Sequence, residues 1–246
     1  MDNRFLRTEM LIGKENLDKL RKSRVAVFGI GGVGGYACEA LARCGIGSFL
    51  LVDSDTVSET NINRQIIANT STVGRPKTEV MKERMLEINP EIKIEIRDCF
   101  FLPENADTFD LGGFDYIIDA VDTLTAKLTL IEKAKKENTP IICAMGAGNK
   151  LDPTAFKVED IYATQVCPLA KRMRKECRSR GIDSLKVVYS EEEPRKPFGE
   201  AARTASAERS PDAPRRDLPG SISFVPPAVG LIIASEVVKD LITLPD

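Results

Sequence analysis

Short apolar runs alternate with amphipathic stretches between residues 24 and 145, and this alternation predicts strands separated by helices. Five runs rich in Val, Ile and Phe are predicted strands: residues 24–29, 48–53, 92–97, 114–121 and 140–145. The predicted helices are residues 14–22, 33–44, 76–88 and 123–137. Strands joined by crossover helices form a parallel sheet covered on both faces. We therefore expect an α/β fold with a Rossmann-like, mostly parallel sheet and helices on both faces.

Beyond Gly148 the alternation weakens. Residues 151–161 and 185–190 are predicted strands, with a basic helical stretch between them. Residues 194–220 are rich in Pro, Ala, Ser, Arg and Glu and offer few apolar side chains for burial, so a mobile loop is expected there. Order should return at residues 221–225, and the two prolines that follow predict a closing helix up to residue 242. These elements form a carboxyl-terminal strand-helix extension of a single domain, residues 1–246.

Composition narrows the class of protein. A chain of 246 residues with 42% hydrophobic content can bury one large core. The net charge of −2 argues against a uniformly basic nucleic-acid surface but permits a local basic patch. No apolar leader is recognisable at the amino terminus, and the late apolar stretch at residues 225–233 is too short to cross a bilayer. We expect a cytoplasmic protein without a membrane partner.

The chain contains no histidine, which excludes a Ser-His-Asp triad, a Cys-His pair and histidine-ligated metal sites. Its six cysteines form no CxxC pair, so neither a zinc knuckle nor a disulfide framework is expected. Chemistry must therefore use carboxylates, Lys, Arg, Cys and backbone groups. Cys167 has two interpretations: a structural thiol, which is favoured, or a nucleophile with a lowered pKa that forms a thioester.

A glycine-rich turn indicates a nucleotide site. Residues 29–34 read Gly-Ile-Gly-Gly-Val-Gly directly after an apolar run, and Asp53 ends the next predicted strand. Glycines let the backbone approach a phosphate, and the amides and dipole of the following helix stabilise its charge. The carboxylate of Asp53 can accept a hydrogen bond from a ribose hydroxyl. This motif alone does not separate nicotinamide, flavin and adenylating enzymes.

The polar segments that follow favour an adenylating enzyme. Residues 53–65 read DSDTVSETNINRQ, Lys77 follows Arg75-Pro76, and Asp122 lies beyond the fourth predicted strand. Amide and cationic side chains that converge on a phosphate chain suit attack on the α phosphate of ATP, with Mg²⁺ held by a carboxylate. A substrate carboxylate is ionised near neutral pH, so it can attack without a general base.

These segments resemble the adenylating domain of the ubiquitin-activating-enzyme-like superfamily, which includes the ThiF-type and MoeB-type activators. The resemblance implies ATP and Mg²⁺ as cofactors, with Asp122 as the metal ligand. It implies nucleotide contacts by Gly31, Gly32, Gly34, Asp53, Asp55, Asn61, Arg64, Gln65 and Lys77, and catalytic roles for Arg64, Lys77 and Asp122. It also implies a homodimer in which Arg64 reaches the partner's site, and a phosphate-contacting arginine at the position of Arg7.

Four further segments resemble the tRNA threonylcarbamoyladenosine dehydratase family: RTEMLIG near the start, VCPLAKRMRK at 166–175, LKVVYSEE at 185–192 and GSISFVPP at 220–227. The resemblance covers nearly the whole chain apart from residues 199–219. It implies adenylation of the carboxylate of threonylcarbamoyladenosine in tRNA, followed by ring closure with loss of AMP. A cysteine desulfurase or a sulfur acceptor is implied as a further partner.

Three alternatives stay open. The first is an adenylyltransferase that activates the carboxyl-terminal glycine of a sulfur-carrier protein, although such activators commonly hold a zinc ion with two CxxC pairs. The second is a nicotinamide-dependent oxidoreductase, for which Lys77 would be irrelevant. The third is a tRNA-binding scaffold without activity, which should tolerate the loss of Arg64 or Asp122.

The basic stretch at residues 171–180 supports a tRNA substrate, since it contains six Lys or Arg against one Glu. On a helix, Leu169, Met173 and Cys177 fall on one face, which leaves the cations on the remainder. We predict contacts to the tRNA backbone from Lys171, Arg172, Arg174 and Lys175. The alternative is an ordinary solvated helix face.

Overall fold

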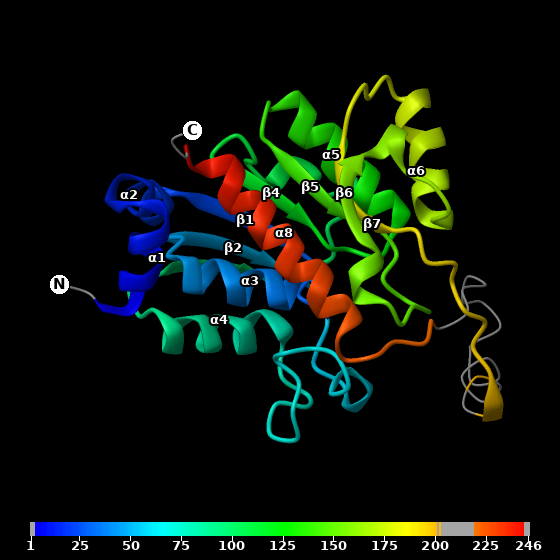
Figure 1. Ribbon diagram of the computed structural model, residues 1–246, viewed down its shortest axis with the longest axis horizontal. Helices are drawn as coiled ribbons and strands as arrows, with labels where there is room; N and C mark the ends of the chain where they lie inside the picture. The colour runs from blue at the N-terminus through cyan, green and yellow to red at the C-terminus, as the bar shows by residue number, and fades with distance from the viewer. Residues whose placement is uncertain (1–2, 201, 203–218, 244–246) are drawn as a thin grey trace.

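The computed structural model describes residues 3–200, 202 and 219–243 (Figure 1). Its centre is a seven-stranded sheet in the order β3-β2-β1-β4-β5-β7-β6. The strands are β1 Arg24–Phe28, β2 Ser48–Val52, β3 Lys93–Arg97, β4 Tyr116–Asp119, β5 Ile141–Ala144, β6 Phe156–Asp160 and β7 Lys186–Ser190. Neighbouring strands pair in parallel except for β6, which is antiparallel to β7. The predicted Rossmann-like, mostly parallel sheet is confirmed.

Helices cover both faces of the sheet. They are α1 Leu6–Ile12, α2 Lys14–Lys22, α3 Gly34–Cys44, α4 Lys77–Ile88, α5 Leu124–Lys136, α6 Pro168–Ser179 and α8 Val225–Leu241. Buried residues of α3, α4 and α8 form one apolar core with the sheet, and buried residues of α5 and α6 form a second core on the opposite face. The predicted two-sided cover is therefore present.

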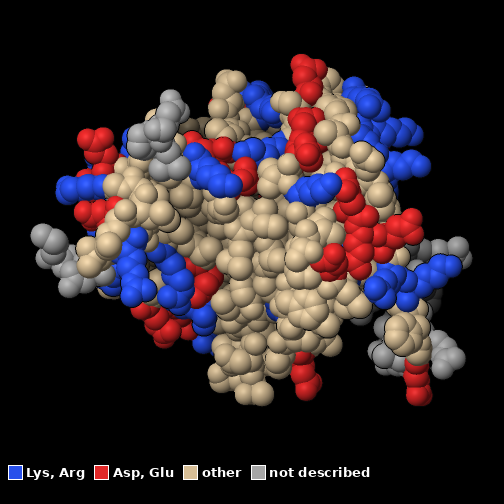
Figure 2. Space-filling model, in the orientation of Figure 1, with Lys and Arg blue, Asp and Glu red and all other residues tan. Residues whose placement is uncertain are grey.

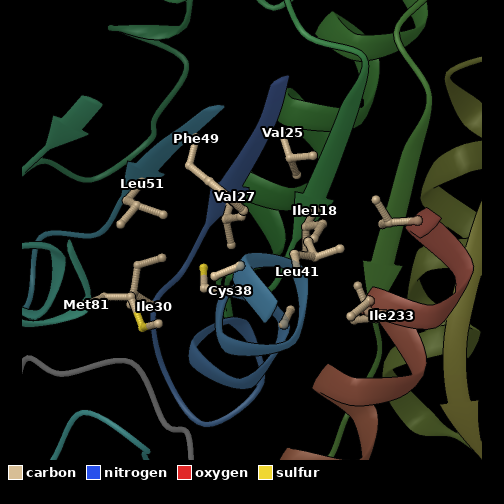
Figure 3. Packing of buried hydrophobic residues seen from close by; sticks show 14 of the residues in the cluster. Val25, Val27, Ile30, Cys38, Leu41, Phe49, Leu51, Met81, Ile118 and Ile233 are labelled. Carbon is tan, nitrogen blue, oxygen red and sulfur yellow. The ribbon is translucent and has the colours of Figure 1, made fainter. Parts of the chain in front are cut away.

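The strand sequences produce these two cores by alternation, because successive side chains of a strand point to opposite faces. In β1, Val25 and Val27 join the core under α3, whereas Ala26 and Phe28 join the core under α5. Figure 3 shows Val27 beside Cys38 of α3, with Ile233 of α8 on the same side of the sheet. Burial of each large apolar side chain contributes about 1.5–3 kcal/mol. A strand segment buried on both faces must be apolar at every position, as residues 25–28 of β1 are, whereas Arg24 at the start of the strand is exposed.

Several boundaries differ from the predictions. The fourth strand is shorter than residues 114–121, and residues 153–155 form a 3-10 turn before β6 because the Asp152 carboxylate accepts a hydrogen bond from the Thr154 amide. Helix α1 was not predicted. Residues 221–224 lead into α8 as a turn and contain no strand. Of the predicted mobile loop at 194–220, residues 201 and 203–218 lie outside the described residues. None of the described helices is both long enough and apolar enough to span a membrane.

The sheet order fixes the place of a ligand site. From β1 the chain proceeds outward through β2 to β3 and then crosses to β4 and β5 on the other side of β1. In open parallel sheets, ligands bind beyond the carboxyl ends of the strands where the winding direction reverses. The loops after β1, β2 and β4 therefore meet at one crevice.

Candidate active site

A cavity of about 600 Å³ opens at this crevice. Every residue of the predicted nucleotide set except Gly34 lines it, namely Gly31, Gly32, Asp53, Asp55, Asn61, Arg64, Gln65 and Lys77. Asp122 lines it as well, so the three predicted catalytic residues share one cavity. Arg7 lies on α1 and is not among the lining residues.

Two glycines shape the turn and two face the cavity. Gly29 has a φ of +90°, and a Cβ there would lie 2.6 Å from the carbonyl oxygen of Ala120. A Cβ at Gly34 would lie 1.8 Å from the carbonyl oxygen of Gly29, so Gly34 allows close packing of the turn against the helix, and its nucleotide contact stays a prediction. Gly31 and Gly32 line the cavity just before α3 begins, which places the positive end of that helix at the cavity.

Asp53 is fixed against the glycine turn. One carboxylate oxygen, Oδ2, accepts a hydrogen bond from the backbone amide of Ile30 at 2.6 Å, and Oδ1 accepts one from the amide of Asp55 at 2.8 Å. Burial raises the pKa of Asp53, while the nearby Lys77 ammonium and the two amides act in the opposite direction. Each oxygen keeps a further lone pair, so the carboxylate can accept a ribose hydroxyl at the end of β2.

Lys77, the first residue of α4, presents its ammonium group to the cavity. Its Nζ lies 2.6 Å from Oδ2 of Asp55, and its backbone amide donates to the carbonyl oxygen of Asp55 at 3.0 Å. The side chain of Lys77 is 6% exposed, whereas that of Asp55 is 55% exposed. The lysine is therefore held in place by a solvated carboxylate, which a phosphate group can replace at low cost. Asp55 orients Lys77, a role that the sequence did not reveal.

The segment after Asp55 supplies amides and a guanidinium. Arg64 donates from Nη1 to the carbonyl oxygen of Thr60 at 2.9 Å and to Oδ1 of Asn63 at 3.1 Å, and burial lowers its pKa. Arg64 lines the cavity of its own chain, and its reach into a partner's site stays a prediction. These two bonds tie its guanidinium to the segment that carries Asn61 and Gln65.

Two aspartates near the end of β4 have different surroundings: Asp119 is the last residue of the strand, and Asp122 lies in the loop that follows. Asp122 lines the cavity and accepts a hydrogen bond from Oγ1 of Thr123 at 3.2 Å. Asp119 is fully buried, and its Oδ2 lies 2.8 Å from Nζ of Lys127, which also donates to the carbonyl oxygen of Ala144 at 2.8 Å. The sequence analysis missed Lys127. A signal existed, because Lys127 falls on the buried stripe of α5 with Leu130, Ile131 and Ala134.

The basic helix α6 is confirmed, but its cations do not all face solvent. Met173 and Cys177 are buried, as predicted, and Figure 2 shows Lys and Arg side chains gathered at the place of α6 in Figure 1. Arg174 is half-buried and donates to the carbonyl oxygen of Thr164 at 2.9 Å and to the Thr164 hydroxyl. The guanidinium of Arg174 therefore anchors the loop before α6, and its contact with tRNA stays a prediction. Lys171, Arg172 and Lys175 are exposed.

Cys167 immediately precedes α6 and is buried in the second core. A thiol shielded from solvent cannot receive an acyl group from a substrate in the cavity without rearrangement. The structure therefore favours the structural interpretation.

Fold and cavity together define a nucleotide-binding α/β protein of the adenylating type, and comparisons with known proteins agree. The chain belongs to the ThiF family, whose model matches residues 5–245. It is 42% identical over 243 residues to the tRNA threonylcarbamoyladenosine dehydratase of Bacillus subtilis, covering 98% of this chain and 96% of that protein. It is also 42% identical over 176 residues to the Escherichia coli protein of the same name, covering 72% of this chain and 66% of that protein.

Solved structures give the same result. The crystal structure of the E. coli tRNA N6-threonylcarbamoyladenosine dehydratase, TcdA, in complex with ATP has a TM-score of 0.84 and 34% identity to this chain. The match covers 97% of this chain and 93% of that one. The E. coli MccB structure with ATP, at 20% identity and a TM-score of 0.66, shares the fold.

Proposed function

We propose that this protein is an ATP-dependent tRNA threonylcarbamoyladenosine dehydratase that works through an acyl-adenylate. One observation carries the proposal: a chain similar over 98% of its length to such a dehydratase brings Arg64, Lys77 and Asp122 from three separate segments to one cavity. A redox site has no need of this positive charge, whereas a triphosphate does.

ATP would lie across the glycine turn. Asp53 would accept the ribose hydroxyl, and the amides before α3 would meet the phosphates together with Asn61, Arg64 and Lys77. On binding, Lys77 would exchange the carboxylate of Asp55 for phosphate oxygens. Positioning and neutralisation of charge supply most of the catalysis in phosphoryl-group chemistry.

Asp122 is the residue we propose for Mg²⁺. Within the described ranges no three Asp, Glu or Cys side chains group as a metal cage. A single carboxylate nevertheless fits this ion, because Mg²⁺ keeps several waters and takes its remaining ligands from one or two carboxylates and the substrate phosphates. When bound, Mg²⁺ would neutralise charge on the phosphates and on the departing pyrophosphate.

In the first step, a carboxylate oxygen of threonylcarbamoyladenosine attacks the α phosphorus of ATP, and the bond to pyrophosphate breaks. In the second step, a nitrogen or oxygen of the same modification attacks the activated acyl carbon, loses its proton and releases AMP. The net result is loss of one water from the nucleoside at the expense of ATP. No thiol carrier is needed, which agrees with the burial of Cys167.

The sulfur-carrier alternative is not favoured. The molybdopterin-synthase adenylyltransferase of Salmonella typhimurium is 34% identical over 128 residues, which is 52% of this chain. The match to the B. subtilis dehydratase extends through the carboxyl-terminal extension as well. Pyrophosphate exchange measured with a sulfur-carrier protein as the only substrate separates the two functions.

For tRNA, we propose that Lys171, Arg172 and Lys175 of α6 contact backbone phosphates, because they form the exposed part of a basic helix. Changing Lys171 and Lys175 to Glu should weaken tRNA binding and flatten its dependence on salt, since each phosphate contact contributes to the slope. Lys19→Glu with Lys22→Glu, on α2, is the matched control of equal charge. Equal weakening by both pairs would contradict a specific surface.

We also propose that the protein forms a homodimer and is located in the cytoplasm. A cysteine desulfurase or a sulfur acceptor stays a predicted partner. Sedimentation of the purified protein tests the dimer directly.

The reaction is tested by mass analysis of tRNA nucleosides after incubation with ATP and Mg²⁺. Loss of one water from threonylcarbamoyladenosine, with release of AMP, is the expected result. Exchange of pyrophosphate that depends on a carrier protein and not on modified tRNA would overturn the proposal.

A further inference from the structure

The cavity extends to both sides of the glycine turn, and the nucleoside of ATP would fill only one of them. Asp53 and residues 99–102 line the side beyond β2 and β3. The sheet order places β4 and β5 on the other side of β1. Because the carboxylate at the end of β2 is the proposed acceptor for the ribose hydroxyl, the nucleoside would lie on the β2 side. The β5 side is left for a second molecule.

The β5 side of the cavity is lined by small and apolar groups with few polar ones. Ala147 and Gly148 follow β5, Pro219 and Ser221 come from the segment that leads into α8, and Pro226 lies in the first turn of α8. Such a lining, with a small number of placed polar groups, is typical of a site that binds an organic substituent.

Two buried polar atoms of this cavity lack hydrogen-bond partners among the described residues: the hydroxyl of Ser221 and Oε1 of Gln65. Both residues line the cavity. Nε2 of Gln65 lies 3.8 Å from the position of a Cβ on Gly31, which places this amide over the glycine turn, between the two sides. A buried polar group without a partner destabilises a fold, so its retention indicates a ligand that completes the bond.

The position of Ser221 is fixed by segments that are distant in the sequence. Nδ2 of Asn63 donates to the carbonyl oxygen of Ser221 at 3.0 Å. The amide of Asn149 donates to the carbonyl oxygen of Gly220 at 2.7 Å, and the amide of Gly220 donates to Oδ1 of Asn149, also at 2.7 Å. Asn149 adopts a φ of +61°, an unfavourable backbone conformation that this pair of bonds stabilises. The wall is thus built to hold Ser221 in one place.

We propose that the β5 side of the cavity is the subsite for the acyl substituent of the substrate, and that the Ser221 hydroxyl hydrogen-bonds its neutral polar groups. The inference rests on the proposed function. The attacking carboxylate must approach the α phosphorus opposite the departing pyrophosphate, and ribose and phosphates occupy the Asp53 and Lys77 sides. The acyl chain of the substrate carries hydroxyl and carbonyl groups. One of these groups would hydrogen-bond the Ser221 hydroxyl while the carboxylate of the acyl chain lies at the glycine turn.

The test compares Ser221→Ala with Ser223→Ala, an exposed serine of the same loop that does not line the cavity. For each variant, calorimetry with ATP and Mg²⁺ gives nucleotide affinity, and AMP release with tRNA carrying threonylcarbamoyladenosine gives kcat/KM. We expect Ser221→Ala to lower kcat/KM about tenfold with ATP affinity within about twofold of wild type, because one hydrogen bond is lost on the acyl side only. Ser223→Ala should match wild type in both.

A bulkier variant adds an independent measurement. Ser221→Leu should fill the subsite, abolish AMP release with modified tRNA and still bind ATP. If Ser221→Ala lowered ATP affinity as much as kcat/KM, Ser221 would belong to the nucleotide site, and the acyl subsite would be overturned. Full activity of Ser221→Ala and Ser221→Leu would overturn it too, while leaving the dehydratase function intact. A wild-type protein that leaves the modified nucleoside unchanged overturns the function itself and the subsite with it.

Discussion

Two lysine–aspartate pairs lie near the carboxyl ends of β4 and β2, the strands on either side of β1, and their different burial gives them different roles. Lys127 and Asp119 lie 2.8 Å apart with both side chains buried, whereas Lys77 and Asp55 lie 2.6 Å apart with Asp55 largely in solvent. The buried pair has no access to a ligand, so it fixes the end of β4 and the start of the loop that carries Asp122. The half-exposed pair can exchange its carboxylate for a phosphate. Two pairs with similar Nζ–Oδ2 distances can therefore have different functions.

The largest effect should come from breaking the buried pair. Lys127→Met should lower the free energy of unfolding by about 3–5 kcal/mol, because Asp119 is left as a buried charge without its cation. Denaturant unfolding measures the loss. The double variant Lys127→Met with Asp119→Asn should recover part of it. A single variant as stable as wild type would show that the pair does not support the fold.

Lys77→Met is the matched change in the other pair. It should lower kcat/KM for AMP release by about 100–1,000-fold, in the range seen when one preorganised group that stabilises charge in the transition state is removed. Its free energy of unfolding should change by about 1 kcal/mol or less, since the partner is solvated. Loss of stability comparable to Lys127→Met would erase the distinction between the two pairs.

Glu39 of α3 lies between these extremes, because it is buried while its partner Arg43 is exposed and its partner Arg84 is partly exposed. Burial acts to raise the pKa of Glu39, but the hydrogen bonds from Arg84 and Arg43 outweigh it and lower the pKa. Glu39→Gln should cost about 1–2 kcal/mol at pH 7, discounted for the solvated arginines.

The same group predicts a pH dependence. A lowered pKa in the folded state gives stability that is present above the ordinary glutamate pKa of 4.5 and is lost as the pH falls through the folded value. Unfolding measured from pH 7 down to about pH 3.5 should therefore show wild type losing more stability than Glu39→Gln. Parallel curves would contradict the assignment.

The smallest effect should come from Asp55→Asn. This change removes a carboxylate that is 55% exposed, so the free energy of unfolding should fall by less than about 1 kcal/mol. Asp119→Asn, the same chemical change in the buried pair, is the control and should cost several times more. Thermal melts of the two variants side by side give the comparison directly.

Much of the fold and site was predictable from local patterns. The apolar strands, the glycine turn and Asp53 follow rules that operate over a few residues, and Arg64, Lys77 and Asp122 did meet at one cavity. The contacts that could not be predicted have tertiary causes. Gly34 is required by close packing against Gly29, and Arg174 donates to Thr164 in the loop before α6. Neither contact leaves a mark in the local sequence.

The sequence by itself determined the order of strands and helices, the glycine turn, and a chemistry without histidine. Only the tertiary structure decided that Lys127 would be buried against Asp119, that Asp55 would orient Lys77, and that Ser221 would reach the cavity wall. The physical reason is that strand and helix patterns arise between near neighbours in the chain. Whether a side chain is buried depends on which distant segments pack around it. Burial in turn decides how strongly a charged group or a hydroxyl interacts and whether a ligand can reach it.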